Sequence, residues 1–199
     1  KPANPMINAG AIVTTSLING KGDKKFKRIL ELTRTMANNP SITYNEEVYL
    51  SEKSTADKNR ALAYMMKSRG MIHEDVEDVL DNYFKQCSIE IDTLDLANIG
   101  VFIANGCKGL DNYINVTSGK LNSIILGIMV TSGMYNHSGE YAVEVGIPSK
   151  SGVGGGIMAA IPNKLGIATF APSLDKHNNS SAGQGMMKSL AAKLNLRLF

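Results

Sequence analysis

Two short apolar runs and the turn between them decide the fold: Gly156-Ile-Met-Ala-Ala-Ile161, Pro162-Asn-Lys164 and Leu165-Gly-Ile-Ala-Thr-Phe170. A turn of Pro, Asn and Lys between two such runs predicts an antiparallel hairpin. Just upstream, Tyr141, Val143 and Val145 alternate with smaller or polar residues, which also indicates a strand. We therefore expect a small antiparallel sheet in the part of the chain after residue 138.

Helical spacing dominates on both sides of these strands. Near the C-terminal end, Met186, Leu190 and Leu194 share one stripe of a helix predicted over 182–194. Helices that are followed by strands, instead of alternating with them, indicate an α+β fold. The helices predicted upstream cover 9–18, 24–38, 46–53, 57–68, 73–84, 94–105 and 123–132.

The change of pattern divides the chain into two regions. We expect 1–138 to be a mainly helical region, and 139–199 to hold the antiparallel strands and the C-terminal helix. Two or three strands make a marginal sheet. We therefore expect further strands, from a segment upstream of Lys1, to complete the sheet.

Burial can be predicted for some individual side chains. In the range 24–38, apolar residues recur at helical spacing, so we expect this helix to turn its Lys and Arg side chains to solvent. Cys87 and Cys107 form no CxxC pair and lie in apolar helical contexts, where a buried reduced thiol is usual. Reduced cysteines without a disulfide framework favour a cytoplasmic protein.

Composition excludes several classes of function. The 199 residues are 43% hydrophobic and 20% charged, and a formal net charge of +3 is too small and dispersed for a nucleic-acid or membrane surface. The longest apolar run, 124–130, is far shorter than the roughly 20 residues that cross a bilayer. His73, His137 and His177 are far apart and lie in no metal-ligand spacing. We expect no nucleic-acid or membrane partner and no metal site.

The Gly-rich segment Lys150-Ser-Gly-Val-Gly-Gly-Gly156 carries the clearest chemical motif. It lacks the GxxxxGK[ST] order of a phosphate-binding loop and strand-like sequence follows it, so close strand packing explains its glycines better. Its Lys-Ser-Gly triplet is chemically similar to the Lys-Thr-Gly of serine β-lactamases and penicillin-binding proteins. Such enzymes need an upstream Ser-x-x-Lys nucleophile, whereas Ser173-Leu-Asp-Lys176 lies downstream in a polar setting. We interpret that match as a turn.

Further blocks occur along the whole chain: Asn4-Pro-Met-Ile-Asn-Ala-Gly-Ala-Ile12, Ser51-Glu52, Asp57-x-Asn59-x-Ala61, Asp81-x-Tyr83-Phe84-x-x-Cys87-Ser88-Ile89, Ser132-Gly-Met-Tyr135 and Pro172-x-Leu174-Asp175. With Lys150-Ser-Gly-Val153, they resemble in identity and order the blocks of the bacterial and mitochondrial glutaminase family. That family is built on a β-lactamase-like, penicillin-binding-protein-like fold. The resemblance implies that fold here, with the helical region followed by an antiparallel sheet and a C-terminal helix.

The resemblance also implies an activity. Glutaminases hydrolyse L-glutamine to L-glutamate and ammonia through a serine acyl-enzyme, with no metal or organic cofactor. In the family, the Ser-x-x-Lys pair precedes the Asn-Pro-Met block, so we expect the nucleophile upstream of Lys1 and expect the 199 residues alone to be inactive. The family further suggests a homodimer or homotetramer.

Six site residues follow from matching positions in these blocks. Asn8, Glu52, Asn59 and Tyr83 are implied to bind substrate, so region 1–138 holds most of the pocket. A free amino acid needs an anion for its α-ammonium, which suits Glu52, and neutral donors for its α-carboxylate, which suit the two Asn and the Tyr.

The last two site residues are implied to act in catalysis as well as in binding. Tyr135 is expected to carry a proton or to orient the nucleophile, and the main-chain N–H of Val153 to contribute to an oxyanion hole. Without the family blocks, these residues would have ordinary explanations as caps, solvated faces or core side chains.

Two alternatives remain open from the sequence. The first is an amino-acid-binding module without catalysis, which would keep the pocket and lack the nucleophile. The second is a penicillin-binding-type serine hydrolase, which shares the fold. A pocket of Glu and Asn suits a free α-amino acid better than a peptide.

Overall fold

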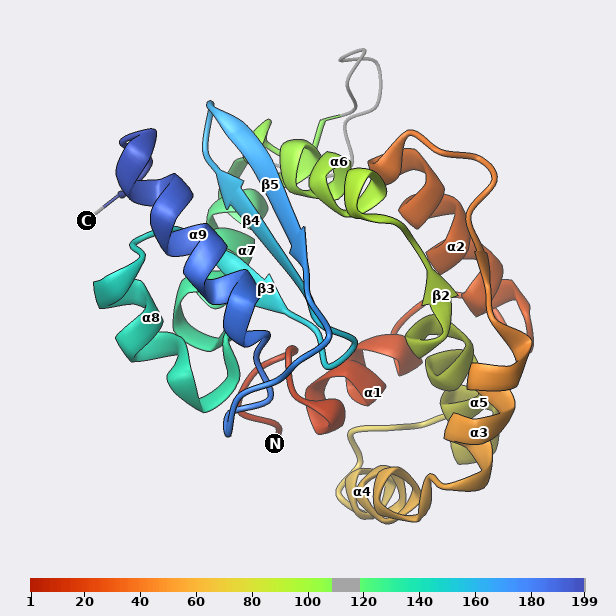
Figure 1. Ribbon diagram of the computed structural model, residues 1–199. Helices are drawn as coiled ribbons and strands as arrows, with labels where there is room; N and C mark the ends of the chain where they lie inside the picture. The colour runs from red at the N-terminus through yellow and green to blue at the C-terminus, as the bar shows by residue number, and fades with distance from the viewer. Residues whose placement is uncertain (109–118, 199) are drawn as a thin grey trace. The chain divides into compact units, whose positions relative to one another are not determined.

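The computed structural model describes residues 1–108 and 119–198, which form an α+β structure (Figure 1). The first elements are mostly helical, as the sequence predicts: α1 (Asn8–Ser16), α2 (Lys24–Ala37), β1 (Thr43–Tyr44), α3 (Glu46–Ser54), α4 (Asp57–Ser68), α5 (Val76–Cys87) and β2 (Ile89–Glu90). The remaining elements are α6 (Thr93–Ala104), α7 (Gly119–Ser132), the 3₁₀ helix η1 (Tyr135–His137), α8 (Ser138–Glu144), β3 (Ser149–Ser151), β4 (Gly156–Ile161), β5 (Leu165–Phe170) and α9 (Ser181–Lys193).

Contacts group the chain into two compact units. Unit 1 comprises Lys1–Arg34 and Pro40–Ile91, and unit 2 comprises Thr35–Asn39 and Asp92–Phe199. The division predicted from the sequence, at residue 138, rests on a change of secondary structure and not on contacts, so it stays a prediction. Residues 109–118 of its helical region lie outside the residues that the structure describes. Within residues 1–108 and 119–198, no helix has the length and apolar character to span a membrane.

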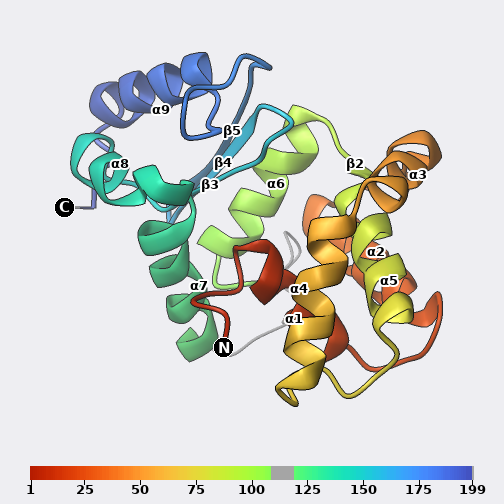
Figure 2. The same ribbon diagram turned by 90° about the horizontal axis from the view of Figure 1, so that it is seen from below.

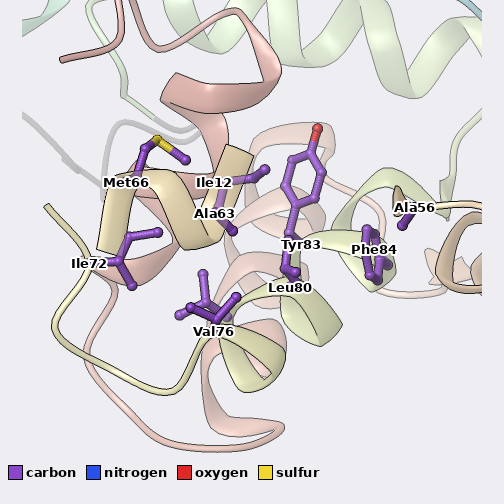
Figure 3. Close-up of a cluster of buried hydrophobic side chains, with 10 residues drawn as sticks. Ile12, Ala56, Ala63, Met66, Ile72, Val76, Leu80, Tyr83 and Phe84 are labelled. Atoms are coloured by element: carbon purple, nitrogen blue, oxygen red, sulfur yellow. The ribbon is translucent and has the colours of Figure 1, made fainter. Parts of the chain in front are cut away.

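Unit 1 is built on the mutual packing of α1, α4 and α5, with α3 packed on α5. Its core contains Ile12 of α1, Ala63 of α4 and Leu80 of α5, all with no measurable exposure. Figure 3 shows the labelled side chains of this cluster, with the Tyr83 ring between Ile12 and Phe84 in this view and its hydroxyl directed away from the other side chains. Apolar burial of this kind contributes about 25 cal/mol per Å² and holds the helices in fixed register.

Side-chain caps begin α3 and α5, the helices that carry Glu52 and Tyr83. The Asn45 side chain accepts a hydrogen bond from the Val48 backbone at the start of α3, and the Asp75 side chain accepts one from Asp78 at the start of α5. Each cap satisfies a backbone N–H that the helix itself leaves free.

Lys25 corrects the expectation that α2 keeps its basic side chains in solvent. This lysine is fully buried. Its Nζ donates to the carbonyl oxygens of Ser16 at 3.0 Å and Ile18 at 2.6 Å, and lies 2.8 Å from a carboxylate oxygen of Glu74. The last carbonyls of a helix have no partner within it and carry a partial negative charge, so they can hold a buried ammonium. Periodicity alone does not show such a partner.

Unit 2 contains a three-stranded antiparallel sheet in the order β3-β4-β5. The predicted hairpin is confirmed, with Gly156 opposite Phe170 and Ile161 opposite Leu165. In β4, Ile157, Ala159 and Ile161 join the core that includes Met187 of α9. Contacts with α6 involve β4 and β5, and Figure 2 shows α9 and α6 on opposite sides of the strands.

The strand predicted from Tyr141, Val143 and Val145 is wrong, because these residues lie in or directly after helix α8. Tyr141 and Val145 are each 3% exposed, whereas Val143 is 74% exposed. Two buried residues four apart share one face of a helix, and an exposed residue between them does not fit a strand that buries all three. A pattern over so few residues cannot distinguish the 3.6-residue period of a helix from the two-residue period of a strand.

The predicted C-terminal helix is confirmed as α9, but its buried face differs from the predicted stripe. Gly183, Met187 and Ala191 are buried, while Met186 is 41% exposed and Leu194 is 55% exposed. The buried face of α9 is displaced by one residue from the predicted stripe, which corresponds to a rotation of about 100° about the helix axis. The small Gly183 and Ala191 allow close packing on the sheet, and a search for large apolar residues overlooks them.

Candidate functional site

Asn8 and Asn59 form a direct contact in unit 1. The Asn8 Nδ2 donates to the Asn59 Oδ1 at 3.0 Å, which joins the first turn of α1 to the first turn of α4. The turn that leads into α1 is held by Asn4, whose side-chain oxygen accepts hydrogen bonds from the backbone N–H groups of Met6 at 2.9 Å and Ile7 at 3.2 Å. A Cβ at Gly10 would lie only 1.9 Å from the Asn4 carbonyl oxygen, so this turn requires glycine.

Glu52, Tyr83 and Cys87 form a second group in unit 1. Tyr83 and Cys87 are four residues apart on α5, and their side chains are hydrogen-bonded. Desolvation raises the pKa of the Cys87 thiol to about 11, against the effect of the Tyr83 hydrogen bond, and the nearby Glu52 charge raises it further. The interaction between Glu52 and Cys87 therefore places the α3 carboxylate close to the α5 pair. Cys87 is exposed as a residue, which corrects the predicted burial, whereas Cys107 is buried as predicted.

The predicted binding residues of unit 1 combine one charged group with neutral hydrogen-bonding groups. Glu52 is exposed and offers an anion, while Asn8, Asn59 and Tyr83 offer neutral donors and acceptors. Tyr83 is buried in the core of unit 1, whereas Asn8 and Glu52 are exposed.

Tyr135 lies at a strained position in unit 2. It begins η1 with φ of +52°, the left-handed region that a tyrosine rarely adopts. The preceding turn is pressed against β3, since the Ser151 N–H donates to the Gly133 carbonyl oxygen at 3.0 Å. A Cβ at Gly133 would lie 1.9 Å from the Ser149 carbonyl oxygen. The turn therefore places Tyr135 beside the Lys-Ser-Gly strand.

Lys150 of β3 lies over the ring of Tyr135, with its Nζ 4.9 Å from the ring centroid, and donates to the Ser151 carbonyl oxygen. Burial lowers the pKa of Lys150 to about 8 and raises the pKa of the Tyr135 phenol. At neutral pH the phenol is protonated, and a pKa of about 8 leaves roughly a tenth of Lys150 uncharged and able to accept a proton. Two groups with opposite perturbations in contact are typical of acid–base sites.

Val153 lies in the turn between β3 and β4 and is 66% exposed. The turn is closed by hydrogen bonds from the Gly152 N–H to the Gly156 carbonyl at 2.9 Å and from the Gly155 N–H to the Gly152 carbonyl at 3.0 Å. A turn fixed in this way can present backbone N–H groups to a ligand.

The structure thus brings the predicted residues together in groups within each unit. Asn8 meets Asn59, Glu52 lies near the Tyr83–Cys87 pair, and Tyr135 meets Lys150 near the Val153 turn. The sequence marked Lys150 and Ser151 only as members of the Lys-Ser-Gly triplet, and the structure adds the contact of Lys150 with the Tyr135 ring and its lowered pKa. Its position in the Lys-Ser-Gly triplet was the available signal. Cys87 was not selected, although its spacing of four from Tyr83 on a helix was visible.

Other features of the described residues do not coincide with these groups. An open pocket of about 350 Å³ in unit 2 contains none of the six predicted residues, and its lining includes His137, Asp175, Gln184 and Lys188. The described residues hold no cluster of three His, Cys, Asp or Glu side chains suited to a metal. The segment 173–176 lies in a loop outside the helices and strands, as the sequence predicts.

Comparison with known proteins identifies the relatives of this chain. A sequence model described as Glutaminase matches residues 1–199. The chain belongs to the glutaminase family. Glutaminase 2 of Clostridium perfringens is 55% identical over 200 residues, which are 100% of this chain and 66% of that protein. Glutaminase of Clostridioides difficile is 54% identical, with 65% of its length covered. The chain therefore spans slightly less than two thirds of the length of these glutaminases.

Solved structures confirm the predicted fold. The Bacillus subtilis glutaminase YbgJ, in covalent complex with 5-oxo-L-norleucine, matches with a TM-score of 0.94 and 37% identity. The match covers 100% of this chain and 70% of YbgJ. The chain thus has the β-lactamase-like α+β fold of glutaminases, and this membership decides against a penicillin-binding-type hydrolase.

Proposed function

We propose that the complete protein hydrolyses L-glutamine to L-glutamate and ammonia. The observation that carries this proposal is the match of the whole chain to the glutaminase family, with 55% identity to one glutaminase. The residue chemistry agrees with it, because the site residues offer an anion, neutral donors and a perturbed lysine–tyrosine pair. These are the groups that binding and hydrolysis of a free amino-acid amide require.

The proposed binding residues act on the two ends of the α-amino acid. Glu52 pairs with the α-ammonium, and Asn8, Asn59 and Tyr83 donate to the α-carboxylate and hold the side chain in register. Two features support these roles: the hydrogen bond between Asn8 and Asn59, and the proximity of Glu52 to the Tyr83–Cys87 pair.

The proposed chemistry proceeds through a serine acyl-enzyme whose nucleophile lies outside these 199 residues. The serine oxygen attacks the side-chain carbonyl carbon, the carbon–nitrogen bond breaks, and the nitrogen leaves as ammonia after taking a proton. Water then cleaves the ester to release glutamate. The covalent complex of YbgJ supports a nucleophile in that relative, because 5-oxo-L-norleucine is a glutamine analogue with a methyl group in place of the amide nitrogen.

Tyr135, Lys150 and Val153 have distinct roles in this scheme. The Val153 N–H stabilises the negative charge on the carbonyl oxygen. Tyr135 passes its phenol proton to the leaving nitrogen, and Lys150 takes the proton that the serine hydroxyl loses and returns it to the phenol oxygen. The contact of Lys150 with the Tyr135 ring and the lowered pKa of Lys150 support this exchange.

We propose a cytoplasmic enzyme that forms a homodimer or homotetramer. Two free cysteines support a reducing compartment. Cell fractionation and light scattering on the complete gene product test these two points.

Ammonia release tests the activity. The complete gene product is expected to release ammonia from L-glutamine, and the 199 residues alone are expected to release none. A complete product that binds glutamine without releasing ammonia would favour the binding module. A product that neither binds nor hydrolyses glutamine would refute the proposal.

A further inference from the structure

A charged cluster joins α3 to α5 beside the Glu52 group. One oxygen of the Asp81 carboxylate accepts from the Tyr49 hydroxyl and from the Lys53 Nζ, both at 2.5 Å. Tyr49 and Lys53 lie one turn apart on α3, and the Lys53 Nζ also donates to the Tyr49 hydroxyl at 2.9 Å. A single carboxylate of α5 thus binds two side chains of α3.

The second Asp81 oxygen is occupied from its own helix. The Lys85 Nζ lies 2.9 Å from it and 2.6 Å from the carboxylate of Asp23. The Asp81 and Lys85 side chains are 25% and 14% exposed, so this cluster is more shielded from water than an ordinary surface pair. Charge-assisted hydrogen bonds in such surroundings are shorter and stronger than neutral ones.

The cluster and the Glu52 group lie on the same two helices. Glu52 directly precedes Lys53 on α3, while Tyr83 follows Asp81 by two residues on α5. The cluster ties these stretches of the two helices together, and the Glu52 charge on the same stretch of α3 acts on the Cys87 thiol of α5. Because backbone hydrogen bonds hold successive turns of a helix in fixed geometry, tying α3 to α5 at the cluster also limits how far the backbone of Glu52 can move relative to that of Tyr83.

We propose that Asp81 is a positioning residue for recognition of the substrate's α-ammonium group. It holds α3 against α5 so that the Glu52 carboxylate stays in place relative to Tyr83. This inference rests on the proposed function, since it takes Glu52 as the partner of the ammonium. Asp81 does not itself touch the substrate. Its loss therefore weakens ligands that carry the α-ammonium and spares those that lack it.

The experiment compares binding of L-glutamate and glutarate, which differ only in the α-amino group. Calorimetric titration of the complete gene product at pH 7.5 gives both affinities without requiring turnover. The unmodified protein is expected to prefer L-glutamate. Asp81→Asn is expected to weaken L-glutamate binding about tenfold, because a misplaced charge partner loses most of its favourable contact, and to leave glutarate binding unchanged.

Three other variants separate positioning from general loss of structure. Lys53→Met breaks the cluster from the α3 side and is expected to reproduce the Asp81→Asn effect. Asp81→Glu keeps the charge and is expected to restore much of the preference for L-glutamate. Lys188→Met removes an exposed ion pair with Glu144 in unit 2 and is the matched control, with both affinities unchanged.

Each outcome bears on the inference. An unchanged preference in Asp81→Asn would overturn it, while ammonia release by the unmodified protein would leave the proposed function standing. Equal loss of both ligands in Asp81→Asn and Lys53→Met would show a structural role only. If the unmodified protein binds neither ligand and releases no ammonia, the proposed function fails and the inference fails with it.

Discussion

Gly133→Ala is the substitution whose effect follows most directly from the geometry. The new Cβ would lie 1.9 Å from the Ser149 carbonyl oxygen and 2.4 Å from the Met129 carbonyl oxygen. Ordinary contact begins near 3.4 Å, so the turn that carries Tyr135 must retreat from β3 by about 1.5 Å. Both obstacles are backbone atoms, which cannot rotate away as the end of a side chain can.

The energetic cost can be estimated from this displacement. A shift of this size breaks the hydrogen bond from the Ser151 N–H to the Gly133 carbonyl. Overpacking costs about 1–3 kcal/mol and an unsatisfied buried donor costs about 1–3 kcal/mol more, so we expect destabilisation of about 3 kcal/mol. Because the Tyr135 turn moves, kcat for glutamine should also fall.

Gly127→Ala is the matched control in the preceding helix. Gly127 lies inside α7, is exposed, and has nothing within 4 Å of a Cβ position. Alanine is the better helix former, so this variant should be more stable by about 0.5–1 kcal/mol. Urea unfolding measures the free energy of unfolding of both variants, and the two values should differ by about 4 kcal/mol. A Gly133→Ala protein as stable as its parent would refute the close approach of the Tyr135 turn to β3.

Three further predictions test the site in the complete gene product. Glu52→Gln should raise the KM for glutamine at least about tenfold, because the ammonium loses its charge partner, and an unchanged KM would remove Glu52 from the pocket. Tyr135→Phe should lower kcat about 100-fold if the phenol carries protons, whereas a loss confined to KM would leave it a binding residue. The pKa of Lys150 is about 8 when folded and near 10.5 when exposed, so the unfolded chain binds more protons between these values and stability should rise with pH across that window, by on the order of 3 kcal/mol. Urea midpoints at pH 7 and 10 measure this rise, and Lys150→Met should lack it.

The parts of the fold that depend on local sequence were predictable. The hairpin was confirmed residue for residue because its two apolar runs and its turn are neighbours in the chain. Helix α4 matches the predicted range 57–68 for the same reason. Strands β1 and β2 were not predicted, because each has only two residues and the partners, such as Thr43 and Glu90, are far apart in the sequence. A segment of two residues is too short to show the alternation of apolar and polar residues that predicts a strand.

The side-chain environments were less predictable. Buried Lys25 depends on carbonyl oxygens at the end of another helix, and such partners leave no trace in hydropathy. The contact between Asn8 and Asn59 joins residues 51 apart, and only the family resemblance marked both positions. The link between Lys150 and Tyr135 also arises from folding, because the sharp turn at Gly133 brings them together.

The buried Lys25 makes α1 a segment whose opening can be followed chemically. Acylating reagents reach an amine only when it meets solvent, and this amine meets solvent only when the end of α1 separates from the start of α2. Its rate of acylation therefore reports how often this part of the protein opens, without any added label. Asn8 begins the same helix, so the reporter and a candidate binding residue belong to one structural element.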